Sequence, residues 1–239
     1  MPDQPNILFI FSDQQRWDSV GCYGQSLPTT PHLDAMAAEG VRFERAFTPQ
    51  PLCTPARACL HTGRYATEVD TWMLSMALPT DEPTVAHHLT RAGYETGYIG
   101  KWHLASTAER YADPGKRPGQ REACDCRTSP VPRERRGGFD DFWLAADCLE
   151  HTSHGFDGYL FDGEGGRVDM PEGQFRVDWL TDLAVDYLRT RDGQRPFYLF
   201  LSYIEPHWQN DQSTHPAPEE FVDPFRTFAE PGDLADSDV

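Results

Sequence analysis

Residues 52–64 read L-C-T-P-A-R-A-C-L-H-T-G-R, and the rest of the chain is organised around this stretch. Thr54 is a residue type that caps helices, the proline after it suits the first helical position, and Gly63 suits a helix end. The stretch therefore predicts a helix. Cys53 would face the free amides at the positive end of its dipole, where anionic chemistry is favoured, and Arg57 can fold back along the first turn to hold an anion there.

C-T-P-A-R followed by A-x-L-x-T-G-R resembles the signature of the type I sulfatases. In that family a maturation enzyme oxidises the cysteine to formylglycine, whose hydrated aldehyde is the nucleophile. A thiol adduct of sulfate offers no easy second step. A gem-diol does, because one oxygen attacks sulfur and the other, once deprotonated, expels sulfate by re-forming the aldehyde. The resemblance implies this fate for Cys53; the alternative is a buried cysteine ahead of an ordinary helix.

Composition limits the classes of partner. The 239 residues are 38% hydrophobic and 12% aromatic, enough for the core of a globular domain. With 21 basic and 38 acidic residues the net charge is −17, which argues against nucleic acid and anionic membranes as partners. The N-terminus has no signal-peptide pattern and no run of 18 or more apolar residues occurs, so we expect a soluble, cytoplasmic protein.

Residues 6–11 form a continuous apolar run that predicts a buried parallel strand, and Asp13 and Gln14 follow it. Ligands of α/β sheets bind at this end of the strands, and hard cations take oxygen ligands. In sulfatases an acidic pair here binds calcium, so the resemblance implies Ca²⁺, with Mg²⁺ or Mn²⁺ as alternatives, held by Asp13, Gln14 and the formylglycine from Cys53. Gln14 departs from the acidic pair, as in some phosphonate and phosphate ester hydrolases. The alternative is a strand-end aspartate that caps a turn.

Two further strand ends carry polar residues. Lys101 and His103 follow a predicted strand at 94–100; two apart, they point the same way, so one can hold a sulfate oxygen while the other exchanges a proton. In sulfatases G-K-W-H-L is a recognised element, so the resemblance implies that Lys101 and His103 contact the sulfate. His207 follows a predicted strand at 197–204, where family members carry a Pro-His motif that reaches the sulfate or the leaving oxygen. Three tryptophans are available to stack against a sugar ring of the substrate: Trp102, Trp143 and Trp208.

The remaining pattern predicts an α/β domain with a largely parallel sheet flanked by helices, similar to the alkaline phosphatase superfamily and incomplete at its C-terminus. We interpret residues 1–204 as the N-terminal part of a sulfatase catalytic domain, with an exposed, mobile, arginine-rich excursion at 105–138. Residues 205–239 form an irregular, acidic, proline-rich tail. The other expected elements are helices at 30–40, 83–92 and 178–192 and a strand at 41–47.

The function that the resemblance implies is hydrolysis of an organic sulfate ester, on a small molecule or a glycan. Two alternatives stay open: a phosphonate or phosphate ester hydrolase on the same scaffold, favoured by Gln14, and an inactive sulfoglycan-binding remnant. We expect the 239-residue chain to be inactive by itself, because two oxygen side chains and the diol fall short of the roughly six to eight ligands that calcium takes.

Overall fold

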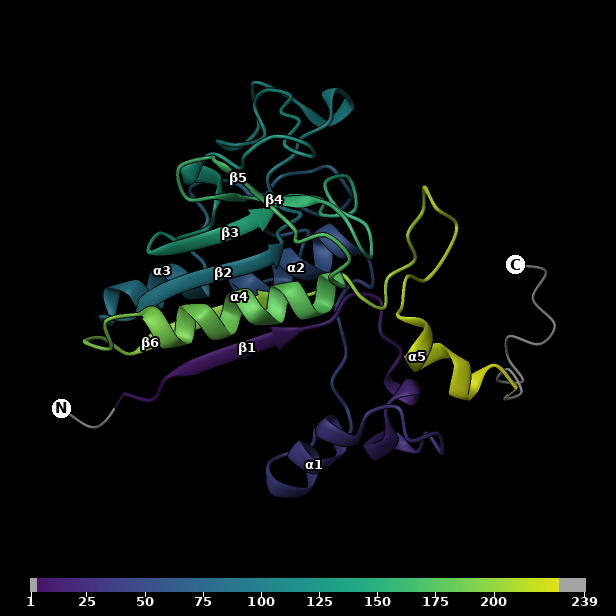
Figure 1. The fold of residues 1–239 in the computed structure, drawn as a ribbon. Helices are drawn as coiled ribbons and strands as arrows, with labels where there is room; N and C mark the ends of the chain where they lie inside the picture. Colours follow the sequence, from purple (N-terminus) through teal and green to yellow (C-terminus); the bar gives the residue numbers. More distant parts are fainter. Residues whose placement is uncertain (1–3, 228–239) are drawn as a thin grey trace.

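The computed structural model describes residues 4–227. One six-stranded sheet runs through it in the order β1-β6-β2-β3-β4-β5 (Figure 1). The first four strands of that order are parallel, and β4 and β5 are antiparallel. The strands are β1 (Ile7–Phe11), β2 (Glu95–Lys101), β3 (Phe142–Ala146), β4 (Tyr159–Asp162), β5 (Arg167–Asp169) and β6 (Phe197–Ser202). The predicted α/β class is confirmed, and the parallel strands place their carboxyl ends at one edge of the sheet.

Helices cover both faces of the central strands. The α-helices are α1 (Pro31–Glu39), α2 (Cys53–Thr62), α3 (Val85–Arg91), α4 (Arg176–Thr190) and α5 (Glu219–Val222). Short 3-10 turns lie at Trp17–Ser19, Gly21–Tyr23, Glu109–Tyr111, Arg133–Arg135 and Asp223–Phe225. The expected helices at 30–40, 83–92 and 178–192 are confirmed within a few residues. Thr84 caps α3 by accepting a hydrogen bond from the His87 amide.

Alternation along β2 and β6 divides the core into two layers. Tyr98 and Phe200 stack at 5.1 Å between ring centroids and pack toward α2 and α3. Ile99 and Leu199 point to the other face, where the apolar side of α4 covers them. Both layers rest on the strands that end at the candidate site, so the site sits on rigid elements.

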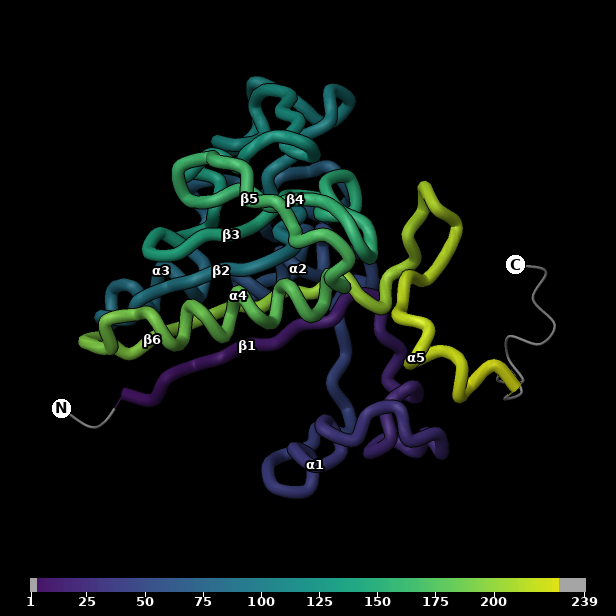
Figure 2. Tube along the Cα trace, in the orientation of Figure 1, coloured from purple at the N-terminus to yellow at the C-terminus, as the bar shows by residue number. Residues whose placement is uncertain are grey.

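The segment at residues 16–50 stands apart from the sheet (Figure 2). No residue of α1 is buried, and Met36 is 64% exposed. The expected strand at 41–47 is wrong: these residues form turns and extended coil, because no described strand lies beside them to complete a ladder. The expectation that 6–11 is fully buried is also wrong, since β1 is the edge strand and Ile10 is 55% exposed on the side that no described element covers.

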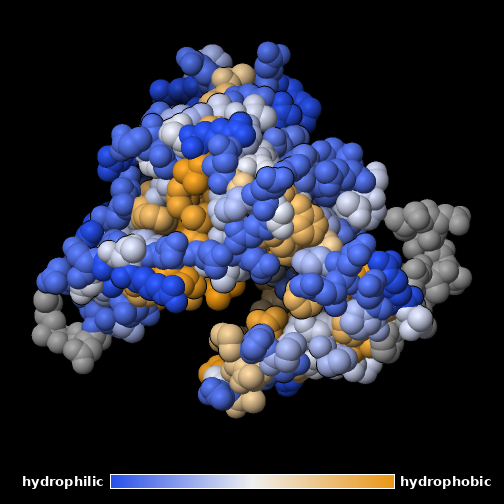
Figure 3. Space-filling model, in the orientation of Figure 1, coloured by the Kyte–Doolittle hydropathy of each residue, from blue (hydrophilic) through white to orange (hydrophobic). Residues whose placement is uncertain are grey.

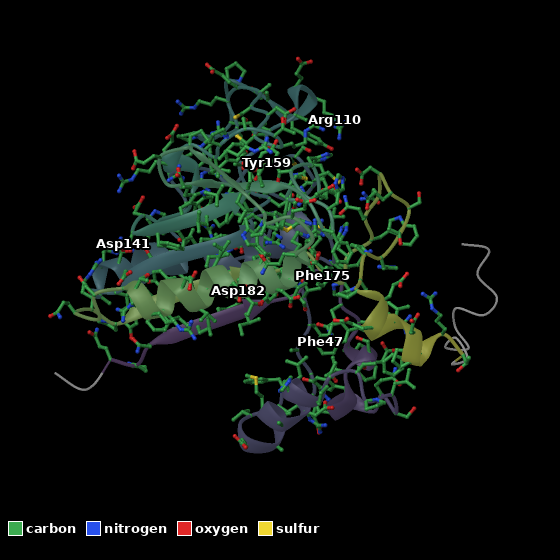
Figure 4. All side chains as sticks on the ribbon, viewed as in Figure 1. Phe47, Arg110, Asp141, Tyr159, Phe175 and Asp182 are labelled. Carbon is green, nitrogen blue, oxygen red and sulfur yellow. The ribbon has the colours of Figure 1, made fainter. Side chains whose placement is uncertain are left out.

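Apolar residues accordingly reach the surface at the lower edge of the sheet region and around α1 (Figure 3). The exposed large apolar side chains there include Leu8, Ile10, Leu33, Met36, Val41, Phe43 and Phe47. Figure 4 shows Phe47 between the α1 segment and the sheet. None of the described helices has the length and apolarity needed to cross a membrane.

The arginine-rich stretch at 105–138 is irregular, as expected, but not exposed throughout. Val131 and Cys126 are buried in the first core layer. Arg135 donates hydrogen bonds to two backbone carbonyl oxygens at 2.8 and 2.9 Å, and Arg136, only 6% exposed, lies over the Trp143 ring. Arg110 does lie at the outer end of the segment (Figure 4). The expectation of an exposed excursion is therefore wrong in part: Thr107 and Gln120 are buried as well. The guanidinium groups of Arg135 and Arg136 satisfy loop carbonyls rather than water.

The described part of the tail, from residue 205 to 227, contains α5 and one 3-10 turn. The acidic end of the tail, Asp233–Val239, lies outside the described residues.

Candidate active site

The helix that organises the sequence begins at the residue proposed as nucleophile. Helix α2 starts at Cys53 with Leu52 at the N-cap, so the expectation that Thr54 caps it is wrong. The Thr54 hydroxyl instead donates to the His103 carbonyl oxygen at 3.1 Å, which ties the helix start to the end of β2. Gly63 ends the helix with a φ of 69°, a left-handed conformation that glycine adopts without strain.

Asp13, just beyond β1, holds two cations from other elements. Its Oδ2 lies 2.8 Å from Lys101 Nζ and 3.0 Å from Arg57 Nη2, and its Oδ1 faces Cys53 Sγ at 3.8 Å. The three charged side chains are almost completely buried. Burial by itself would raise the pKa of Asp13, but Lys101 and Arg57 outweigh it and hold that pKa well below its ordinary value.

Cys53 is part of the same group. Lys101 Nζ lies 3.9 Å from its Sγ and 2.8 Å from Asp13 Oδ2, so the same ammonium contacts both side chains. Burial raises the pKa of the Cys53 thiol in spite of the nearby lysine. The unmodified residue is therefore a neutral thiol at neutral pH and a weak nucleophile. Its Sγ marks the place that the oxygens of a formylglycine diol would take.

Arg57 is placed differently from the expected clamp on the first helical turn. It is 1% exposed, and its Nη1 donates to the Lys101 carbonyl oxygen at 2.6 Å and to Ser202 Oγ at 2.9 Å. With Nη2 on Asp13, the guanidinium joins the ends of β1, β2 and β6. It contributes positive charge to the site and fixes the strand ends, but most of its donors are already used.

The two predicted histidines lie at the ends of β2 and β6. His103 Nε2 lies 3.4 Å from Cys148 Sγ, and its Nδ1 is buried without a hydrogen-bond partner among the described residues. Burial, followed by the charges of Lys101 and Arg57, holds the pKa of His103 well below its ordinary value, so the ring is neutral. His207 Nδ1 donates to the Trp208 carbonyl oxygen at 2.6 Å. Since that nitrogen carries the proton in the neutral ring, Nε2 is left as an acceptor.

A cavity of about 1440 Å³ opens over this group. Asp13, Cys53 and His207 line its floor. Apolar and aromatic side chains form its walls: Phe47, Leu52, Leu60, Tyr65, Leu74 and Trp208. Two of the tryptophans assigned to stacking are not available, because Trp102 is 0% and Trp143 4% exposed within the core.

Metal ligation fits the described residues only in part. Asp13, Cys53 and His207 each offer a ligand atom within 4.8 Å of the others. Asp13 Oδ2 is occupied by the two cations, and the Gln14 amide oxygen accepts a hydrogen bond from the Trp208 amide at 3.0 Å. One carboxylate oxygen of Asp13 and the imidazole of His207 are thus left as ligands beside Cys53. A calcium site has about six to eight oxygen ligands. The described residues therefore do not complete a calcium site.

Sequence reasoning missed a fourth strand end. Asp147 and Cys148 follow β3, and Glu150 lies 3.8 Å from His207 Nδ1. Asp147 is fully buried; its carbonyl oxygen accepts from the His103 amide and its carboxylate from the Ala105 amide. The sequence could have indicated Asp147 and Cys148, because they directly follow an apolar strand, as do the polar residues predicted at the other three strand ends.

The sequence profile of the sulfatase family matches residues 5–237. The chain belongs to the sulfatase family. It is 32% identical over 226 residues to an ulvan-active sulfatase of Formosa agariphila. The aligned residues cover 94% of this chain and 39% of that protein. The first three related sulfatases are matched over only 36–44% of their own length.

Solved structures of sulfatases agree with this chain in fold. The YidJ sulfatase structure from Bacteroides fragilis superposes with a TM-score of 0.73 at 28% identity, over 96% of this chain and 49% of the other. A second structure, in complex with its substrate D-glucosamine-2-N,6-O-disulfate, has a TM-score of 0.73 at 27% identity, over 97% and 40%. The mostly parallel sheet flanked by helices is the alkaline phosphatase-like fold of these sulfatases.

Proposed function

We propose that this chain carries the nucleophile and part of the sulfate-binding site of a hydrolase of organic sulfate esters. The observation that carries the proposal is the placement of Cys53 at the start of α2, with Lys101 3.9 Å and Asp13 3.8 Å from its sulfur. These two side chains come from different strand ends, so only the folded chain assembles them. Membership of the sulfatase family supports the reaction class.

The nucleophile in this proposal is the hydrated formylglycine made from Cys53 by a maturation enzyme. That group supplies an oxygen to attack sulfur and a second oxygen to expel sulfate. The raised pKa of the Cys53 thiol supports the need for the modification, since the thiol itself is not ionised.

The other residues take roles that follow from their contacts. The Lys101 ammonium, next to the nucleophile, attracts the sulfate oxygens, and Arg57 holds Lys101 and Asp13 in place while adding positive charge. Neutral His103 is suited to accept a proton. His207 binds the sulfate or serves the leaving oxygen in its protonated form, in which Nε2, free of the Trp208 contact, is also a donor. Asp13, with Gln14 near it, is the proposed contact for a divalent cation, Ca²⁺ in the first place.

A glycan sulfate is the substrate class that we favour. One relative is named for action on ulvan, and one structural neighbour was solved with a sulfated glucosamine. In this chain, Trp208 and Tyr65 are exposed on the cavity wall, where an aromatic face can stack on a sugar ring.

The test is turnover of matched esters by the entire gene product, co-expressed with a maturation enzyme, with the 239-residue chain assayed beside it. Release of sulfate that is lost in Cys53→Ala and strongly reduced in Lys101→Met would support the proposal. Faster turnover of the matching phosphonate ester would favour the second function, which the amide at Gln14 in place of a carboxylate supports. Binding of sulfated glycans without any turnover would favour the third alternative, an inactive sulfoglycan-binding remnant.

A further inference from the structure

A second group of metal-ligand side chains lies in the turn after β3. Cys148, Glu150 and His151 each offer a ligand atom, and these atoms lie within 4.8 Å of one another. The turn is anchored by Leu149, which is 0% exposed and has a φ of 50°, and whose carbonyl oxygen accepts the amides of residues 152 and 153. The three side chains therefore belong to one well-packed turn rather than to separate loops.

The donor set indicates the kind of metal. A thiolate, an imidazole and a carboxylate together suit Zn²⁺ and similar transition metals, whereas calcium takes only oxygen. In a tetrahedral zinc site, nitrogen and oxygen ligands lie about 3.4 Å from each other, as follows from bonds of about 2.1 Å. His151 Nε2 and Glu150 Oε1 are 4.0 Å apart, so a contraction of about 0.6 Å brings this pair to ligand distance. His151 can supply it, because its side chain is 42% exposed.

Neighbouring contacts support a site there. The Asn210 amide holds Glu150 Oε2 at 3.1 Å, which leaves Oε1 on the side of His151. Cys148 is 5% exposed and its only polar side-chain neighbour within hydrogen-bonding distance among the described residues is His103 Nε2, at 3.4 Å. That imidazole belongs to the candidate active site and has an unpartnered buried nitrogen on its other side.

We propose that Cys148, Glu150 and His151 form a transition-metal site, for Zn²⁺ or a metal of the same preference, beside the candidate active site and distinct from the cation site at Asp13. Binding releases the thiol proton of Cys148, and the resulting thiolate bonds to the metal. The sulfur beside His103 Nε2 thereby changes from a thiol, which can donate a hydrogen bond, to a thiolate, which only accepts one. Metal binding therefore changes the surroundings of His103, a residue of the candidate active site.

Cobalt is the probe for this site, because a cobalt–thiolate bond gives a charge-transfer band in the near ultraviolet. The 239-residue chain would be titrated with Co²⁺ under reducing conditions in a Cys53→Ala background, which removes the thiol nearest Asp13. We expect the band to saturate at one equivalent and to disappear when Zn²⁺ is added. Cys148→Ser should abolish the band, and His151→Ala, at a half-exposed position that does not endanger folding, should weaken cobalt affinity at least tenfold.

Two controls separate this site from other metal contacts. His32→Ala removes an exposed imidazole on α1 and should change nothing. Cys124→Ser tests the thiol pair Cys124 and Cys126, whose sulfurs lie 3.2 Å apart, and should also leave the band. A band that survives Cys148→Ser, that vanishes in Cys124→Ser, or that is unaffected by His151→Ala would overturn the proposal. The measurement uses no turnover, so its outcome is independent of the proposed sulfatase activity.

Discussion

Substitution of Asp13 by asparagine should destabilise the fold itself, apart from any effect on activity. Asp13 is 7% exposed and pairs with Lys101 and Arg57, each 1% exposed. Removing one partner of a buried ion pair costs about 3–5 kcal/mol, because the remaining charges stay buried without compensation. The asparagine oxygen still accepts a hydrogen bond, so we expect a loss near the lower limit, about 3 kcal/mol of unfolding free energy.

Urea and thermal unfolding of the 239-residue chain, followed by circular dichroism, would measure this loss. About 3 kcal/mol corresponds to a fall in Tm of about 6–12 °C for a protein of this size. Asp223→Asn is the matched control, since Asp223 pairs with Arg226 at 2.6 Å on the surface, and we expect it to change stability by less than about 0.5 kcal/mol. The double variant Asp13→Asn/Lys101→Met should lose less than the sum of the single losses, because the first change has already removed the partner of the lysine.

The ion group of Asp13, Lys101 and Arg57 also determines how folding stability depends on pH. The pKa of Asp13 is lowered in the folded state, so its contribution to stability is complete above the pKa of an unfolded aspartate, about 3.9. That contribution is lost as the pH falls below this value toward the folded-state pKa. The difference in stability between parent and Asp13→Asn should therefore be constant from pH 5 to 8 and shrink under stronger acid. Equal stability of Asp13→Asn and Asp223→Asn at neutral pH would refute the buried-triad argument.

Three other predictions concern modification, metal and pH. Mass spectrometry of the tryptic peptide that contains Cys53, from a host with a maturation enzyme, should show the aldehyde, and only unmodified cysteine would contradict it. In calcium titrations, Asp13→Asn should weaken binding more than Gln14→Ala, because a carboxylate contributes charge and an amide only a dipole; equal affinities of both variants and the parent would remove these residues from the metal site. Burial lowers the pKa of His154, but hydrogen bonds to Asp211 and a second aspartate outweigh it and raise the net value. Stability from this contact is thus complete below the unfolded histidine pKa, about 6.5, and is lost as the pH rises through the folded pKa. NMR titration of the His154 ring would check this, and the rise in pKa should be smaller in Asp211→Asn, where only the contact with Asp157 remains.

Local sequence predicted those parts of the molecule that depend on near neighbours in the chain. Apolar runs at 6–11 and 197–204 became strands because continuous apolar sequence is stable only where a sheet buries or pairs it. Helix α2 ends at Gly63 because the left-handed residue that ends a helix is a local requirement. Since parallel strands end at one edge, polar residues after three strands were enough to indicate a site containing Asp13, Lys101 and His207.

Tertiary structure decided which of these residues remain available for chemistry. Insertion of β6 between β1 and β2 brings Ser202 to Arg57, which therefore bridges three strand ends instead of lying along its own helix. Trp143 on β3 and Trp102, directly after β2, lie in the core layer that packs toward α2 and α3. Period-two alternation sets which side chains share a face of a strand but not which face is buried. Residues 41–47 alternate like a strand yet form none in the described structure, since a strand needs a partner that its own sequence does not contain. Pairing between distant segments is the reason: spacing along the chain sets which side chains share a face, but only the packed sheet sets what lies opposite them.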